Sequence, residues 1–181
     1  MTSSPKRFLD PELLRKAACE VVCNARRENV GVALIGGYAL QAYGSPRLTG
    51  DIDFVAAQSL ASMSEVGTLS FGGVKTVASN GVPVDLVVRT DDYEPLYEAA
   101  LEDATTRGGE IPVVRPEYLA AMKMAANRPR DQADLDFLIG EEVVNVLETR
   151  ALVRKYLGPY AAEEFDQIVM ISRWRREEGQ E

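Results

Sequence analysis

Apolar side chains follow two different spacings at the start of the chain. Over residues 10–29 they recur with the period of an amphipathic helix. Asp10 suits the N-cap of this helix and Pro11 suits its first position. Residues 30–35 (VGVALI) are instead a short apolar run that stops at Gly36-Gly37. This run predicts a buried strand that ends in a tight turn.

Further strands are predicted where apolar runs lie between turn-forming residues. The strongest are residues 51–57 (DIDFVAA) and 82–89 (VPVDLVVR), and both contain aspartate. Between them, residues 58–81 are small, polar and rich in glycine, with weaker strand patterns near 66–71 and 74–78. The first part of the chain therefore supplies several strands for one sheet.

Helical patterns fill most of the remaining chain. A short helix is predicted over residues 38–43 and a longer one over 93–107, followed by a brief extended stretch, IPVVR. From Pro116 onward the pattern is helical, with breaks near Asn127–Arg130, Gly140 and Gly158-Pro159. These elements predict an α/β fold, with a mixed sheet flanked by helices over residues 1–115. A C-terminal helical region follows over 116–181 and can share the same core.

Composition narrows the chemistry of the protein. The 181 residues include no histidine and two cysteines, which excludes Ser-His catalysis and makes a structural zinc site close to impossible. Cys19 and Cys23 are four residues apart in the first helix, a poor geometry for a disulfide, so both are expected to be free thiols. Any reaction must then use carboxylates, lysine, arginine and hydroxyl groups.

The sequence also predicts where the protein is located and how it interacts with nucleic acids. No apolar run approaches the length of about 20 residues that spans a bilayer, and the N-terminal segment lacks the apolar core of a signal peptide. A cytoplasmic location is expected. The net charge of -8 argues against a general DNA- or RNA-binding protein, although a local basic patch stays compatible with it.

Three aspartates are the candidate catalytic and metal-binding residues. Asp51 and Asp53 are separated by one residue, so in a strand they would point to the same side. Asp85 interrupts the apolar run of residues 82–89, where an unpaired buried carboxylate would be costly. If the two strands are neighbours, the three carboxylates can meet, and their hard oxygen atoms suit Mg²⁺. Separately, each has an ordinary explanation, such as exposed acids on an edge strand or a turn cap.

The glycine pair Gly36-Gly37 is the candidate phosphate-binding turn. Glycine lets the backbone approach a ligand closely, and the start of a helix offers unpaired N–H groups to phosphate. A Gly-Gly pair alone is usually only a turn. Its position ahead of Asp51 and Asp53 is what indicates a binding site.

The stretch LIGGYALQAYGSPRLTGDIDFV, residues 34–55, resembles the signature of the nucleotidyltransferase superfamily. The closest resemblance is to bacterial AbiEii-type nucleotidyltransferases, which include toxins of type IV toxin–antitoxin systems. Their Gly-Gly-x-Ala-Leu and Arg-x-Thr motifs match Gly36, Gly37, Ala39, Leu40, Arg47 and Thr49. A later helical motif matches residues 123–136. Where many active members have Gly-Ser, this chain has Gly-Gly and so lacks a serine hydroxyl for the triphosphate.

The resemblance implies a nucleotidyltransferase-type fold and transfer of a nucleoside monophosphate from an NTP to a hydroxyl group. Asp51, Asp53 and Asp85 would hold Mg²⁺ or Mn²⁺, and Asp85 could alternatively take the proton of the acceptor. The nucleotide contacts would be Gly36, Gly37, Arg47, Thr49, Lys123 and Asp131, with Lys123 also counted as catalytic. The implied acceptor is RNA, such as a tRNA 3′ end, or a protein, and a cognate antitoxin would be a partner. A small-molecule nucleotidyltransferase and an inactive binding or regulatory module are the alternatives.

The helical pattern gives Lys123 and Asp131 a partly independent basis. Lys123 falls at the edge of the apolar face of its helix, where a long side chain can reach across a cleft. Asp131 is in phase with Leu135 and Leu138, and an acid on the inward face of a helix is unusual without a partner. A solvated lysine and a helix N-cap are the ordinary alternatives for these two residues.

Overall fold

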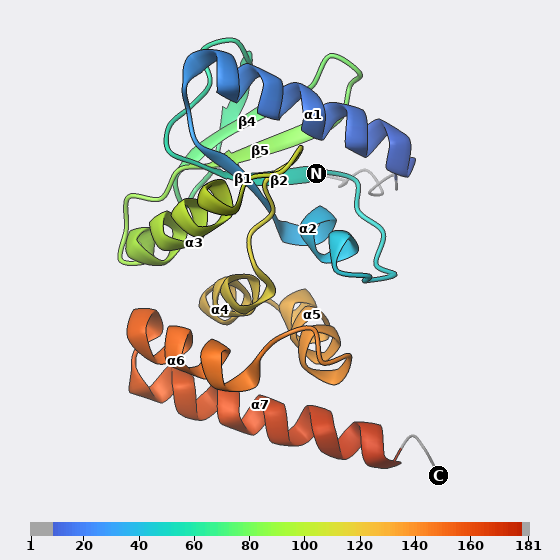
Figure 1. Ribbon diagram of the computed structural model, residues 1–181, viewed down its shortest axis with the longest axis vertical. Helices are drawn as coiled ribbons and strands as arrows, with labels where there is room; N and C mark the ends of the chain where they lie inside the picture. The colour runs from blue at the N-terminus through green and yellow to red at the C-terminus, as the bar shows by residue number, and fades with distance from the viewer. Residues whose placement is uncertain (1–8, 179–181) are drawn as a thin grey trace, which may run out of the picture. The chain divides into compact units, whose positions relative to one another are not determined.

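The computed structural model describes residues 9–178 (Figure 1). The strands in this part of the chain are β1 (Val32–Ile35), β2 (Ile52–Ala56), β3 (Glu65–Thr68), β4 (Gly73–Val77) and β5 (Pro83–Val87). The helices are α1 (Pro11–Glu28), α2 (Gly36–Ala42), α3 (Glu94–Arg107), α4 (Pro116–Ala126), α5 (Pro129–Gly140), α6 (Val146–Leu157) and α7 (Pro159–Glu178). A mixed sheet with flanking helices and a helical C-terminal region confirms the predicted α/β class.

The five strands form one sheet in the order β1-β2-β5-β4-β3. β2 and β5 run parallel, whereas the β1–β2, β3–β4 and β4–β5 pairs are antiparallel. The segment 58–81 therefore contributes the β3–β4 hairpin, which pairs with β5 and leaves β5 in the middle of the sheet. This order brings the two strands that contain aspartate side by side.

Alternation along β2 and β5 places four apolar side chains on one side of the sheet, and the two aspartates share the other side with Val55 and Val87. Ile52, Phe54, Val84 and Leu86 are all 0% exposed and point to one side of the sheet. Asp53 and Asp85 point to the other side and are half-buried. We call the side of the sheet that carries Asp53, Asp85 and Lys75 the open face. The buried side restrains the register, because a slip by one residue would move these four apolar side chains to the open face.

Helix α1 forms as its sequence predicts. The Asp10 carboxylate accepts a hydrogen bond of 2.8 Å from the backbone N–H of Glu12, which caps the first turn. The helix contacts β1, and the Glu20 carboxylate accepts the backbone N–H of Ser79 at 3.0 Å. Figure 1 shows α1 in front of strands β4 and β5. Its buried side is apolar and consists mainly of Leu14, Ala17, Ala18, Val21, Val22 and Ala25.

Two boundaries near the candidate site differ from the sequence prediction. Strand β2 begins at Ile52, so Asp51 lies in a bend just before the strand and not on its face. Helix α2 begins at Gly36, two residues earlier than expected, so both glycines belong to its first turn. The alternation argument therefore applies to Asp53 and does not place Asp51.

The chain divides into two compact units, which are described separately. Among residues 9–178, the first contains those up to Glu94 together with Leu101–Val114, and the second contains Pro95–Ala100 and those from Arg115 onward. In the second unit, helices α4 to α7 enclose an apolar core that includes Leu119, Leu135, Leu138 and Phe165. Within the part of the chain that the structure describes, no helix is both long and apolar enough to cross a membrane.

Candidate functional site

Asp53 and Asp85 are direct neighbours across two parallel strands. Their Cα atoms are partners in the β2–β5 register, so both side chains point to the open face from strands about 4.8 Å apart. Two carboxylates at this separation repel unless positive charge lies near them. The sequence prediction that the two strands lie together is confirmed, and the pair forms the centre of the candidate site.

The Asp53 carboxylate also lies against the backbone of Gly36. Asp53 pairs with Ile35, the last residue of β1, and the chain turns into α2 directly afterwards. A Cβ atom at residue 36 would lie 2.0 Å from Asp53 Oδ2, and the φ angle of Gly36 is +68°. Both the left-handed backbone and the close approach therefore require glycine here.

The second glycine lies against the two residues of the Arg-x-Thr motif. A Cβ atom at Gly37 would be 3.1 Å from Thr49 Oγ1 and 3.8 Å from Arg47 Cζ. Thr49 is only 5% exposed, and its hydroxyl donates a 2.8 Å hydrogen bond to Asp51 Oδ1. Gly36, Gly37, Arg47, Thr49, Asp51 and Asp53 thus gather around the start of α2, next to Asp85.

The donor set fits Mg²⁺ in one particular way. Among residues 9–178, no three cysteine or acidic side chains are arranged as a ready metal site. Mg²⁺ is usually held by one or two carboxylates and completes its octahedral shell with water and substrate phosphates. The in-register pair Asp53 and Asp85 matches this mode of binding, whereas a metal enclosed entirely by protein ligands does not fit. Asp51 stays a predicted ligand, and its carboxylate accepts the hydrogen bond from Thr49.

Lys75 is a basic residue beside the acidic pair that the sequence analysis did not single out. It is the β4 partner of Asp85, so its side chain points to the open face, and it is exposed. The alternation of β4 predicts an exposed position for Lys75, but its proximity to Asp85 follows only from the strand register. No signal in the sequence reveals that register.

Lys123 and Asp131 belong to the second unit, where they form a buried ionic cluster. Lys123 is 6% exposed, and its ammonium donates to Asp131 Oδ1 at 3.0 Å and to Asp134 Oδ2 at 2.6 Å. Arg128 adds a bond of 2.7 Å from its Nε to Asp131 Oδ2. The cluster gives both predicted residues a structural role. Their predicted contact with a nucleotide stays a prediction.

Two ordinary expectations for this cluster are wrong. Lys123 is not a solvated helix lysine, because its ammonium is buried between two carboxylates. Asp131 is not the N-cap of α5: Arg128 occupies that position, and Asp131 is the third helical residue, whose carboxylate accepts the Arg128 backbone N–H at 3.1 Å. The Asp131 side chain therefore caps the helix by accepting the backbone N–H of the N-cap residue, Arg128.

The environment of Asp131 determines its protonation. Burial acts to raise the pKa of this carboxyl, but hydrogen bonds and positive charge from Arg128 and Lys123 outweigh burial and hold the pKa below its usual value. Asp131 is therefore ionised at neutral pH, as its ion pairs require.

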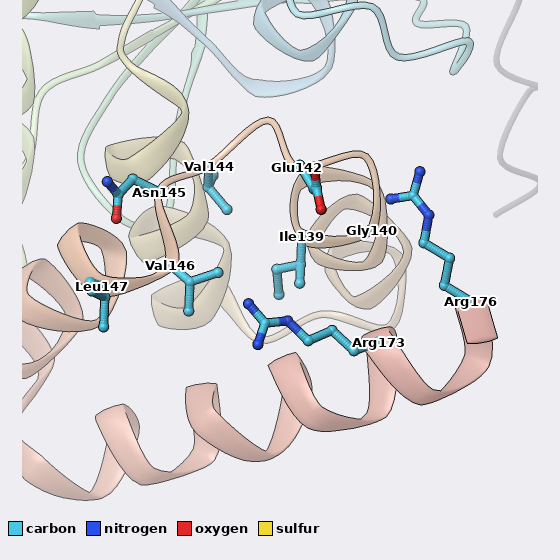
Figure 2. Close-up of a pocket in the computed structure, with 9 residues that line it drawn as sticks. All are labelled: Ile139, Gly140, Glu142, Val144, Asn145, Val146, Leu147, Arg173 and Arg176. Atoms are coloured by element: carbon cyan, nitrogen blue, oxygen red, sulfur yellow. The ribbon is translucent and has the colours of Figure 1, made fainter.

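The second unit also contains a cavity of about 330 Å³ between the α5–α6 connection and α7 (Figure 2). Ile139 and Val144 supply apolar walls, whereas Arg173 and Arg176 approach it from α7. None of the residues predicted for the site lines this cavity. The candidate site is therefore the cluster of the first unit, at the start of α2 and on the open face.

Comparisons with known proteins add little to this geometry. Protein-family models and curated protein sequences give no match. Among solved structures, the chain is similar to the crystal structure of an antigenic nucleotidyltransferase-like protein from Paracoccidioides brasiliensis. The sequence identity is 16% and the TM-score 0.49, over 81% of this chain and 79% of that chain. At this sequence identity and TM-score the similarity does not establish a function for this chain.

Proposed function

We propose that this protein is a Mg²⁺-dependent nucleotidyltransferase that moves a nucleoside monophosphate from an NTP to a hydroxyl acceptor. The observation that carries the proposal is the in-register pair of Asp53 and Asp85 beside Gly36. A pair of carboxylates can hold Mg²⁺ together with substrate phosphates, and a glycine turn lets those phosphates approach the backbone. The resemblance of residues 34–55 to nucleotidyltransferases agrees with it.

Each residue of the cluster has a defined task in this proposal. Asp53 and Asp85 provide carboxylate ligands for Mg²⁺, which when bound neutralises the triphosphate and the developing charge of an in-line displacement. Gly36 and Gly37 let the phosphates approach the backbone, and Arg47 adds a positive charge beside Gly37. Asp51 is the third proposed carboxylate ligand, and Thr49 orients its carboxylate.

The acceptor hydroxyl must lose a proton as it attacks the α-phosphorus. As an alternative to holding the metal, Asp85 is suited to accept this proton, because it lies on the far side of Asp53 from the glycine turn. The leaving pyrophosphate then departs on the glycine side, opposite the attacking oxygen. This assignment gives the two neighbouring aspartates different tasks, with Asp53 mainly a metal ligand.

Calorimetric titration with Mg²⁺ and each NTP tests the nucleotide part of the proposal. The wild type should bind at least one NTP only when Mg²⁺ is present, and Asp53→Asn should lose that binding. Asp92→Asn is the matched control, since Asp92 is an exposed aspartate of the same unit outside the cluster. Metal-independent binding, or no binding by the wild type, would exclude the proposed reaction.

The acceptor is tested separately with α-labelled NTPs. An AbiEii-like toxin would label RNA, such as the tRNA 3′ end, or a protein, whereas a small-molecule enzyme would label an alcohol such as an aminoglycoside. Total tRNA, cell protein and a panel of small alcohols are the three acceptor pools. Mg²⁺-dependent NTP binding without labelling of any pool would instead favour the inactive binding or regulatory module.

A further inference from the structure

Lys75 extends the acidic pair into a row of three charged residues across the sheet. Asp53 on β2 pairs with Asp85 on β5, and Asp85 pairs with Lys75 on β4. Residues paired in this way point to the same face. The neighbours of Lys75 along the strand, Val74 and Thr76, are buried on the opposite side.

The ammonium group of Lys75 is available to a ligand. Among the residues that the structure describes, it forms neither an ion pair nor a hydrogen bond, and the side chain is exposed. Its partner on β3 is Gly67, where an added Cβ atom would lie 3.8 Å from Lys75 Cδ. The stem of the lysine therefore passes over a residue without a side chain, so no neighbouring side chain on β3 covers it.

The order of the row places Lys75 on a particular side of the site. Gly36 lies against Asp53, so the sequence across the sheet is glycine turn, Asp53, Asp85 and then Lys75. With strands about 4.8 Å apart, β4 is about 10 Å from β2. A triphosphate held by the glycine turn and Asp53 would leave Lys75 beyond Asp85, on the side from which the acceptor must attack.

We infer that Lys75 binds the acceptor and selects one that carries an anionic group, such as a phosphate, next to its reacting hydroxyl. The inference rests on the proposed function for the direction of attack. A lone ammonium at this position attracts an anion and repels a cation. Lys75 therefore favours a phosphate-bearing acceptor over a polycationic one such as an aminoglycoside, despite the net charge of -8.

Binding measurements on Lys75→Met and Lys75→Glu test the inference without requiring turnover. The probes are a fluorescent single-stranded oligoribonucleotide with a free 3′-hydroxyl, glycerol phosphate, an aminoglycoside and a fluorescent NTP with Mg²⁺. Lys16→Met is the control, because Lys16 is an exposed lysine of the same unit that pairs with Glu12 on α1 at 3.9 Å.

Lys75→Met should weaken binding of an anionic probe about fivefold, as the loss of one exposed charge contact does. If the oligonucleotide is that probe, the slope of log affinity against log salt should fall by about 0.7. Lys75→Glu should weaken binding of the anionic probe further and improve binding of the aminoglycoside. Both Lys75 variants should keep their NTP affinity within about twofold of wild type, and Lys16→Met should keep its affinity for every probe within the same range.

The outcomes separate the inference from the function on which it rests. If the Lys75 substitutions weaken binding of glycerol phosphate but not of the oligonucleotide, the inference is supported and the acceptor is a small phosphorylated alcohol. Equal binding of both anionic probes by wild type and Lys75→Met would overturn it, and so would an equal loss of NTP affinity, which would move Lys75 to the nucleotide side. Failure of the wild type to bind Mg²⁺–NTP refutes the proposed function. The affinity for the anionic probes still tests the role of Lys75 in that case, because it is measured without NTP.

Discussion

A methyl group on residue 36 would occupy the space that the Asp53 carboxylate now fills. Gly36→Ala is therefore expected to displace that carboxylate and to lower Mg²⁺-dependent NTP affinity about tenfold or more. It should also reduce the free energy of unfolding by about 1–2 kcal/mol, because alanine resists a left-handed backbone. Calorimetry and urea unfolding measure the two effects.

Gly108→Ala separates the effect of backbone strain from the effect of the contact with Asp53. Gly108 has a φ angle of +70°, close to the +68° of Gly36, but an added Cβ atom there would meet nothing within 4 Å. This variant should show the loss of stability and keep the affinity for Mg²⁺–NTP. If both variants lose affinity equally, backbone strain and not the contact with Asp53 explains the requirement for glycine.

Thr49 offers a second test at the scale of single residues. Thr49→Val keeps the shape of the side chain but removes the 2.8 Å hydrogen bond to Asp51. We expect a loss of about 1 kcal/mol in the free energy of unfolding and a weaker affinity for Mg²⁺–NTP. Thr49→Ser should restore the affinity because it restores the donor. Normal affinity in Thr49→Val would show that Asp51 needs no orientation by Thr49.

Helices α4 and α5 are joined by the buried cluster of Lys123, Asp131 and Asp134. Lys123→Met would remove the ammonium group that the two buried carboxylates share, so the free energy of unfolding should fall by about 3–5 kcal/mol. Lys155→Met, at an exposed position on α6, should change stability by less than about 0.5 kcal/mol. Urea unfolding monitored by circular dichroism measures both variants.

A compensating change tests whether the cluster acts as a unit. Adding Asp134→Leu to Lys123→Met removes one of the two buried carboxylates that lost the ammonium group, so the double variant should be more stable than Lys123→Met alone. Additive losses in the double variant would mean that the lysine and the aspartate contribute independently. The ion pairs would then be incidental to the stability of the second unit.

The pH dependence of the same cluster follows from the lowered pKa of Asp131. A carboxyl with a lower pKa in the folded state binds protons more weakly than in the unfolded state, where the pKa is about 3.9. Its stabilising effect is complete above that value and is lost as pH falls through the folded pKa. The difference in stability between wild type and Asp131→Asn should therefore be constant from pH 7 to about 5 and shrink below about 4.

Asp136→Asn provides the comparison on the same helix. Asp136 is half-exposed and pairs with Arg175, so its substitution should cost little at any pH. Urea midpoints measured from pH 7 to pH 3 give the two profiles. A difference for Asp131→Asn that grows on acidification would contradict the assigned direction of its pKa.

At the scale of the whole molecule, we expect the two compact units to differ in local unfolding. Lys123→Met weakens the ionic cluster of the second unit, whereas β2 and β5 belong to the first unit. Amide hydrogen exchange should therefore accelerate more in α4 and α5 than in these two strands. Equal acceleration throughout would mean that both units open in a single cooperative step.

The sequence alone predicts the elements that carry the site. Strands around Asp53 and Asp85 and the glycine turn at residues 36–37 come from apolar periodicity and turn chemistry, which are local properties of the chain. The cap of α1 by Asp10 is local for the same reason, since donor and acceptor are two residues apart. Charge and composition likewise restrict the chemistry to carboxylates, hydroxyls and basic side chains before any fold is known.

Only the tertiary structure decides which of these residues meet. The pairing of Asp53 with Asp85, and of Asp85 with Lys75, depends on the strand order β1-β2-β5-β4-β3 and its register. Lys123 shows the same limit: helical phase puts it at the edge of an apolar face, but its burial depends on Asp131 and Asp134 reaching it from the next helix. Periodicity reports the side to which a residue points, whereas contacts between distant segments arise from packing of the whole sheet and bundle.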